Sequence, residues 1–263
     1  RGIVLKKTVG FVLVLLSALV LAASAVEFQS LTVDGNYWFG PAEGIMFIEG
    51  PADYTHNSVS AAISARFSPG FVLGADYTYG KLSNPSQEGE EISIPAGVGY
   101  TYQQQLLGIY VGYPYMLAPG FDVTASAGLG YYANTQKIWD TEDPQEKLSL
   151  TIKCTKPQVG LAAQYKVTPQ FSLRGNFGIF LGTGGTIITD GGIGYNASDS
   201  EIVDISLKLF RWQLEGKYLI KPGLEATAGY RVWDITVSPP ENEEEDSLAL
   251  DSKGLYFGVR YSF

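Results

Sequence analysis

The sequence predicts an all-β protein, a transmembrane antiparallel up-and-down β-barrel of ten strands. Three observations predict this fold class. Apolar residues recur at every second position along most of the 263-residue chain. Four short turns containing proline join pairs of these alternating segments, and longer polar connections separate the pairs. After the N-terminal region no apolar run is long enough for a membrane helix, so a closed barrel is the remaining way to satisfy the backbone in lipid.

The N-terminal segment has the features of a secretory signal peptide. Basic residues at Arg1, Lys6 and Lys7 precede an apolar run at 9–23, and small residues follow at 23–25. We therefore expect a signal peptide at 1–25 and a single barrel domain at 26–263. Without the signal peptide, 15 basic residues face 27 acidic ones, a net charge of −12 that makes nucleic acid an unsuitable partner.

The strands are predicted from the four short turns, at 68–70, 118–120, 168–170 and 221–223. An alternating segment enters and leaves each turn, which gives eight strands. An opening strand at 28–39 and a closing strand at 254–263 bring the count to ten, with eight or twelve as the alternatives. Five longer connections, mostly acidic, are expected near 40–56, 81–97, 135–147, 183–202 and 237–252.

Two irregularities interrupt the alternation. The apolar phase slips between Leu209 and Phe210, and again near Pro157. A β-bulge adds one residue to a strand and shifts its phase, and proline is tolerated there, so we expect bulges at both places. The segment GIMFIEG at 44–50 is a candidate for an extra strand or an inserted loop.

The polarity of the two faces indicates lipid outside the barrel. A water-soluble barrel keeps its apolar residues inside, whereas the second face of these strands carries Ser, Thr, Gly, Gln, Asp and Arg. Aromatic residues cluster on the apolar face beside the short turns, as at a membrane interface. They are Phe67, Phe71, Tyr113, Phe121, Tyr165, Phe171, Tyr218 and Phe263.

These features together resemble the single-chain bacterial outer-membrane β-barrels, in the broad opacity/OmpA-like class and without a specific subfamily. The last strand resembles the C-terminal assembly signal of that class, with an apolar row that ends on an aromatic residue: Leu255, Phe257, Val259, Tyr261 and Phe263. The resemblance implies location in the cell outer membrane, contact with outer-membrane lipid, and recognition of the last strand by the barrel assembly machinery.

Charged residues on the non-apolar face predict a network inside the barrel. All five arginines that follow the signal peptide have this phase, and four carboxylates share it. Buried guanidinium groups need carboxylate partners, so we expect ion pairs across a narrow lumen. The predicted members are Arg66, Asp76, Asp122, Arg174, Arg211, Glu215, Glu225, Arg231 and Arg260.

A ten-stranded barrel leaves at most a narrow passage, because eight strands are just filled by side chains. We therefore expect a structural or surface-interaction role for a barrel with a charge-filled lumen. A porin-like channel for small solutes or ions is the alternative, and an outer-membrane hydrolase is a remote one.

Sequence features assign no catalytic, metal or cofactor site. The one histidine, His56, is expected to be a surface residue at the end of a loop, and Asp53-x-x-His56 departs from the Asp-x-His pair of omptin proteases. The glycine cluster at 182–186 has no helix after it to hold a phosphate. Acidic residues at 88–91 and 241–247 could attract divalent cations, but they lack a fixed ligand spacing.

Overall fold

A computed structural model of the chain describes residues 27–42, 54–68, 70–83, 98–140, 142, 147–182, 184–190, 201–238 and 248–263. Every regular element in these ranges is a β-strand. No helix among the described residues is long and apolar enough to cross a membrane. The candidate signal peptide and the segment 44–50 lie outside the described residues.

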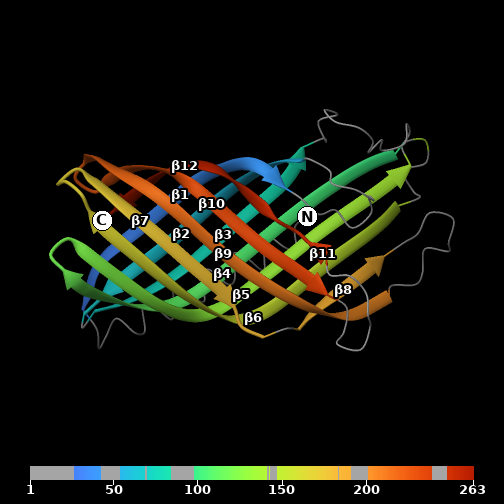
Figure 1. Cartoon of the computed structure of the whole chain (residues 1–263), viewed down its shortest axis with the longest axis horizontal. Helices are drawn as coiled ribbons and strands as arrows, with labels where there is room; N and C mark the ends of the chain where they lie inside the picture. Colours follow the sequence, from blue (N-terminus) through green and yellow to red (C-terminus); the bar gives the residue numbers. More distant parts are fainter. Residues whose placement is uncertain are drawn as a thin grey trace.

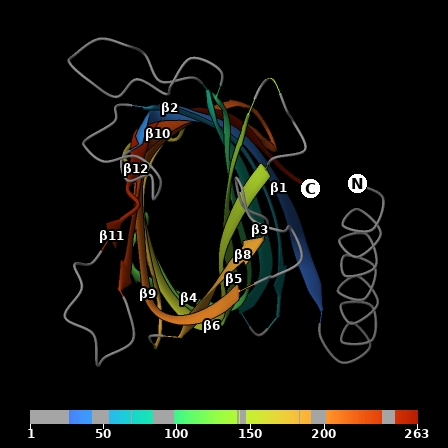
Figure 2. The same cartoon turned by 90° about the vertical axis from the view of Figure 1, so that its right-hand side faces the viewer.

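The strands form one closed antiparallel sheet (Figures 1 and 2). From β1 to β7 each strand pairs with the next one in the chain, β9 pairs with β10, and β12 pairs with both β10 and β1, which closes the ring. The elements are β1 (Phe28–Ala42), β2 (Tyr54–Phe67), β3 (Phe71–Ser83), β4 (Val98–Ala118), β5 (Phe121–Asp140), β6 (Lys147–Lys166), β7 (Phe171–Phe180), β8 (Gly185–Asp190), β9 (Glu201–Lys221), β10 (Leu224–Ser238), β11 (Leu248–Ala249) and β12 (Ser252–Ser262).

Two places in the ring are each shared by two strands. Both β7 and β8 pair with β6 and β9, and both β11 and β12 pair with β10. The wall therefore has ten places, which confirms the predicted barrel of ten strands.

The break between β7 and β8 is held partly by a side chain. Gly182 has a φ of 85°, a conformation that suits glycine. The Lys156 ammonium donates to the carbonyl oxygen of Gly182 at 2.8 Å and to that of Leu207, and Leu181 N donates to the Pro157 oxygen at 2.8 Å. These contacts replace the backbone ladder that the break removes.

Several predicted boundaries and both predicted bulges were wrong. Strand β5 runs on to Asp140, and β8 and β11 lie inside segments predicted to be connections. Leu209 and Phe210 pair with Ile235 and Asp234 in unbroken register, and Pro157 pairs with Leu129 equally regularly. The strands extend past the outer apolar belt, where the alternation of apolar and polar residues is less regular, as in GTIITD of β8. The phase slip at Leu209 and Phe210 has its cause in the barrel interior.

The short turns gather at one end of the barrel, the left end in Figure 1. Gly70, Gly120 and Gly223 in three of them have φ values of 115°, 78° and 80°, which explains why glycine follows proline there. The C-terminus lies at the same end, where the backbone N–H of Phe263 donates to the Leu31 carbonyl at 2.9 Å.

The outer face of the wall is apolar. Leu129, Leu214, Phe257 and Val259 are each more than half exposed to solvent, although they sit in the middle of regular strands. Exposure of such a continuous apolar band is incompatible with water and suits a hydrocarbon environment.

Our first prediction concerns Phe263, which lies at the end of β12 and is 70% exposed. Its ring meets only the Tyr261 ring among the aromatic pairs of the described residues, edge-on at 4.6 Å. We expect Phe263→Ala to lower the free energy of unfolding by less than about 1.5 kcal/mol. We expect the amount of folded barrel recovered from the outer membrane to fall by a much larger factor, because we infer from the resemblance that the assembly machinery recognises the terminal strand.

The matched control is Tyr113→Ala, another outward aromatic near the short turns, with 60% exposure. Urea unfolding in detergent reports stability, and gel mobility with and without boiling reports folded barrel from cells. If Phe263→Ala and Tyr113→Ala reduce assembly equally, the terminal residue acts only through packing.

Candidate functional site in the barrel interior

The half of the interior toward the long connections is filled mainly by apolar side chains, with buried polar ones such as Gln104 and Asn134 among them. Residues from eight strands pack there into one cluster. We call its most buried members the apolar layer, none of which is more than 4% exposed: Trp38, Leu106, Tyr132, Ile152, Phe180, Leu207, Leu209, Trp233, Ile235, Leu250 and Tyr256.

The apolar layer explains the phase slip in β9. Inward positions on this strand are the odd-numbered ones, and they change from apolar Leu207 and Leu209 to charged Arg211 and Glu215. Outward positions become apolar over the same stretch, with Phe210 paired to Ile179 and Trp212 paired to Phe177. The strand keeps its register while each face changes polarity. The inner face, which the sequence predicts to carry polar residues, is therefore apolar in this half of β9.

His56 lies in the interior, so the expectation of a surface histidine was also wrong. Its side chain is fully buried, with Nε2 2.7 Å from Ser58 Oγ and the ring edge-on to Trp38 at 4.5 Å. Gly80 leaves the necessary room, because a Cβ atom there would lie 2.2 Å from His56 Nε2. Ser58 is equally inaccessible, at 2% exposure, so this Ser–His pair is placed for packing. Asp53 lies outside the described residues.

The other half of the interior, toward the short turns, contains a polar cavity of about 530 Å³. Its walls extend from Ser30, Arg66 and Asp122 at the short-turn end to Arg231 and Trp233 beside the apolar layer. All nine residues predicted for the lumen network line this cavity. The structure thus places them around one space, and their individual contacts differ.

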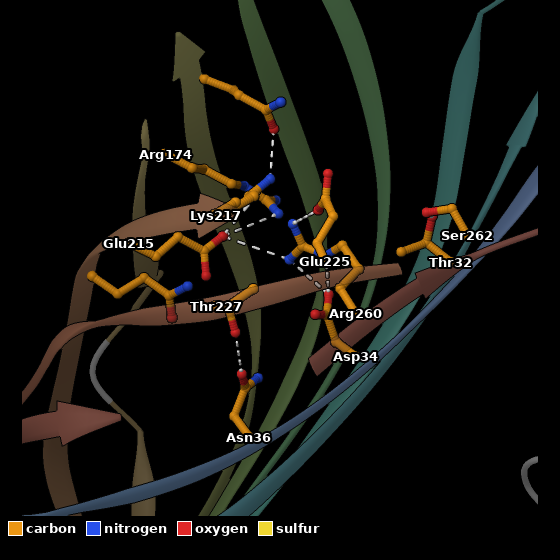
Figure 3. A network of polar contacts seen from close by, with 12 residues as sticks. Thr32, Asp34, Asn36, Arg174, Glu215, Lys217, Glu225, Thr227, Arg260 and Ser262 are labelled. Atoms are coloured by element: carbon orange, nitrogen blue, oxygen red, sulfur yellow. Dashed lines mark hydrogen bonds and ion pairs between the residues drawn. The ribbon is translucent and has the colours of Figure 1, made fainter. Parts of the chain in front are cut away.

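Glu215 is the centre of the first charge cluster (Figure 3). Its side chain is 2% exposed, and Oε1 lies 3.5 Å from Arg260, 3.7 Å from Arg174 and 3.9 Å from Lys217. The other oxygen, Oε2, accepts a hydrogen bond of 2.7 Å from Tyr256 OH, which belongs to the apolar layer. One carboxylate therefore balances several cations and joins them to the closed half.

Arg260 links the first cluster to β1. Its Nε and Nη2 both lie 2.7 Å from Asp34 Oδ2, and Nη1 lies 3.8 Å from Glu225. Asp34 and Lys217 were missed by the sequence prediction. Both have the inward parity of their strands, so the alternation that selected Arg260 and Glu215 would also have found them.

A second ion pair crosses the lumen. Arg211 Nη1 donates to Asp76 Oδ2 at 2.9 Å, and Nη2 donates to Gln158 at 3.3 Å. Strands β9 and β3, which carry Arg211 and Asp76, lie on opposite sides of the ring. This pair therefore occupies the middle of the cross-section.

Three predicted network members form no ion pair with the described residues. Arg66 and Asp122 lie at the short-turn mouth of the cavity. Arg231 is 8% exposed and has only neutral partners, Gln213 at 3.1 Å and Ser60 at 2.9 Å. The predicted assembly row has a different location, on the outer face of β12, where all five side chains are exposed.

Our second prediction concerns Glu215. Glu215→Gln removes the buried charge that balances Arg174, Lys217 and Arg260, so we expect a loss of about 3 kcal/mol in the free energy of unfolding. The control Glu225→Gln should cost under about 1 kcal/mol, because Glu225 is 28% exposed and contacts one arginine at 3.8 Å. Urea unfolding in detergent measures both, and equal losses would show that Glu215 is not the centre of the cluster.

Comparison with known proteins identifies the class. A family model described as "Outer membrane protein beta-barrel domain" matches residues 11–203. No curated protein sequence matches the chain. Among solved structures, the outer membrane protease OmpT of Escherichia coli is similar with a TM-score of 0.59 at 11% identity, over 91% of this chain and 98% of that one.

Two further solved structures are less similar. The attachment invasion locus protein Ail of Yersinia pestis has a TM-score of 0.37 at 8% identity, over 89% of this chain and 98% of that one. The toluene transporter TbuX of Ralstonia pickettii has a TM-score of 0.42 at 10% identity, over 88% and 73%. At 11% identity the OmpT structure shows a shared fold and assigns no activity. Because the family match covers more than half of its length, the chain belongs to the outer membrane protein β-barrel domain family and is an outer-membrane protein.

Proposed function

We propose that this protein is an outer-membrane barrel with a closed lumen, whose role is structural or lies in interactions at its surface. The apolar layer is the observation that carries this proposal. In outer-membrane barrels the short turns face the periplasm and the longer loops face outward. The apolar layer then lies in the extracellular half of the barrel and the polar cavity opens toward the periplasm.

The apolar layer closes the barrel in our proposal because its side chains form one cluster and are almost completely buried. The cluster includes residues of β4, β5 and β6 and residues of β10, β12 and β1 on the other side of the ring. Within it, the rings of Trp38 on β1 and Trp233 on β10 are 5.0 Å apart, past the intervening β12. A hydrated ion would have to shed water to pass such a layer, and burial of an unpaired charge in apolar surroundings is strongly unfavourable.

The charge clusters form a second obstruction on the periplasmic side. The Arg211–Asp76 pair ties opposite walls together, and Lys217 on β9 donates to Gln164 on β6 at 2.6 Å, past the intervening β7. These contacts narrow the passage but leave the cavity between them. The apolar layer is therefore the main barrier in our proposal.

The surface role belongs to the extracellular end. Acidic residues concentrate in the connections at that end, for example at 88–91 and 241–247. A negative surface repels other anionic surfaces and favours cationic partners or divalent cations. We therefore place any interaction with a partner on these connections, and contact with lipid on the apolar outer wall.

A porin-like channel is the second candidate, and the polar cavity is the observation that favours it. A solute entering from the periplasm would find a charged path through half of the barrel and would then meet the apolar layer. Transport would require that layer to move. A hydrolase has less support, because His56 is buried and the similarity to OmpT is one of fold.

Our third prediction is that the refolded wild-type barrel shows no steady single-channel conductance in a planar bilayer. The double variant Trp38→Ala and Trp233→Ala should conduct, because it removes two large rings from the apolar layer. The double variant Asp76→Ala and Arg211→Ala should remain closed, because it leaves that layer intact. All four substitutions together should give the largest conductance.

The gel shift on boiling serves as the folding control for each variant. A steady open pore in the wild type, with substitutions that change only ion selectivity, would overturn the closed-lumen proposal and put the porin-like channel first. Opening by the Asp76 and Arg211 pair alone would move the main barrier to the charge clusters.

A further inference from the structure

We propose that the inner end of the periplasmic cavity binds a small oxyanion, with Arg231 as its principal ligand. The site goes beyond the proposed structural or surface role. It is formed by Arg231 and Arg211, with Ser60, Gln213 and Gln158 around them, where the cavity meets the apolar layer.

Arg231 differs from the other buried arginines in its partners. Arg174, Arg211 and Arg260 each lie within 4 Å of a carboxylate. No carboxylate of the described residues lies that close to Arg231, although its side chain is as buried as that of Arg260, with both residues 8% exposed. Its guanidinium carbon lies 4.8 Å from the centroid of the Tyr256 ring and 5.6 Å from that of Trp38.

These neutral contacts leave the guanidinium without a described carboxylate in direct contact. The ring faces of Tyr256 and Trp38 attract a cation, but they carry no net charge. Removal of a guanidinium from water is costly unless an anion and further hydrogen bonds compensate for it. The apolar layer supplies neither, so compensation has to come from the cavity.

The guanidinium of Arg231 also has N–H groups that donate to no described residue. Nε is used by Gln213 and one N–H of Nη1 by Ser60, and no described residue accepts a hydrogen bond from Nη2. Arginine presents its N–H groups in a planar fork that matches two oxygens of a carboxylate or phosphate. The free edge of Arg231 therefore fits an oxyanion.

Arg211 adds a second positive group to the same end. It lies on the neighbouring strand, where it is paired in register with Trp233, two residues from Arg231. Its partner Asp76 is the only carboxylate in contact with either arginine among the described residues. Two guanidinium groups and one carboxylate leave one positive charge in excess, which one small anion would neutralise.

The cavity provides access and room. It reaches the periplasmic mouth at Arg66 and Asp122, and its volume of about 530 Å³ exceeds that of a phosphate ion with several waters. On the other side the apolar layer closes it. The ligand is therefore a periplasmic oxyanion that enters and leaves by the same mouth.

The test is isothermal titration of the refolded barrel in a neutral detergent, at constant ionic strength, with inorganic phosphate, sulfate, acetate and neutral acetamide as separate probes. We expect saturable binding of one oxyanion per barrel and none of acetamide. The comparison of phosphate with acetate decides which oxyanion the site prefers. Arg231→Gln should weaken binding by at least about tenfold, because it removes the unpaired charge and the fork.

The matched control is Arg66→Gln, which removes an arginine at the mouth of the same cavity and should leave the affinity within about twofold. Arg231→Lys keeps the charge without the fork and should lie between wild type and Arg231→Gln. Equal binding by wild type and Arg231→Gln, or an equal loss in Arg66→Gln, would overturn the proposal.

A second measurement keeps the test decisive if Arg231→Gln does not fold. Phosphate should raise the unfolding midpoint of the wild type progressively at fixed ionic strength, since a ligand that binds only the folded state stabilises it. No rise beyond that seen with acetamide would also overturn the proposal. Conductance is a separate readout, so failure of the anion site and failure of the closed-lumen proposal can be distinguished.

Discussion

Lipid offers no hydrogen bonds, so every backbone polar group in the membrane must be paired within the protein. The rest of this structure depends on that requirement. Strand β12 meets that requirement by pairing with β1 and β10, so the sheet has no free edge in the ring. Closure gives the sheet an outer face, which contacts lipid, and an inner face, whose side chains fill the barrel. Because the ring is narrow, the inward side chains must fill its interior. They do so with different residue types in the two halves of the barrel.

In the half toward the long connections the interior resembles a soluble protein core, with Trp38, Tyr132 and Tyr256 completely buried. In the half toward the short turns the inner face keeps charged residues, which then need partners from other strands. Glu215 lies close to three cationic side chains. The ring of Tyr256 packs in the apolar layer, and its hydroxyl donates a hydrogen bond to Glu215 in the charged half. The two halves are therefore joined by an amphipathic side chain at their boundary.

Much of this fold can be predicted from the sequence, because turns and outward apolar rows are local signals. Pro-Gly turns and the rows on the outer face define the ten-stranded ring. The apolar layer was not predicted, because two adjacent apolar residues such as Leu209 and Phe210 look alike whether a bulge or a change of surroundings causes them. Parity places Arg231 inside, but only the folded ring shows that no carboxylate of the described residues lies within 4 Å of it.

The break between β7 and β8 affects how the wall resists local opening. At this break no continuous ladder of backbone hydrogen bonds connects the neighbouring strands. The Lys156 ammonium and one backbone hydrogen bond from Leu181 connect them instead. A segment with fewer backbone bonds opens at a lower free energy than the ladders beside it. Amide hydrogens next to the break should therefore exchange with solvent before those in the middle of β4 or β5, and this break is a weak seam in the barrel wall.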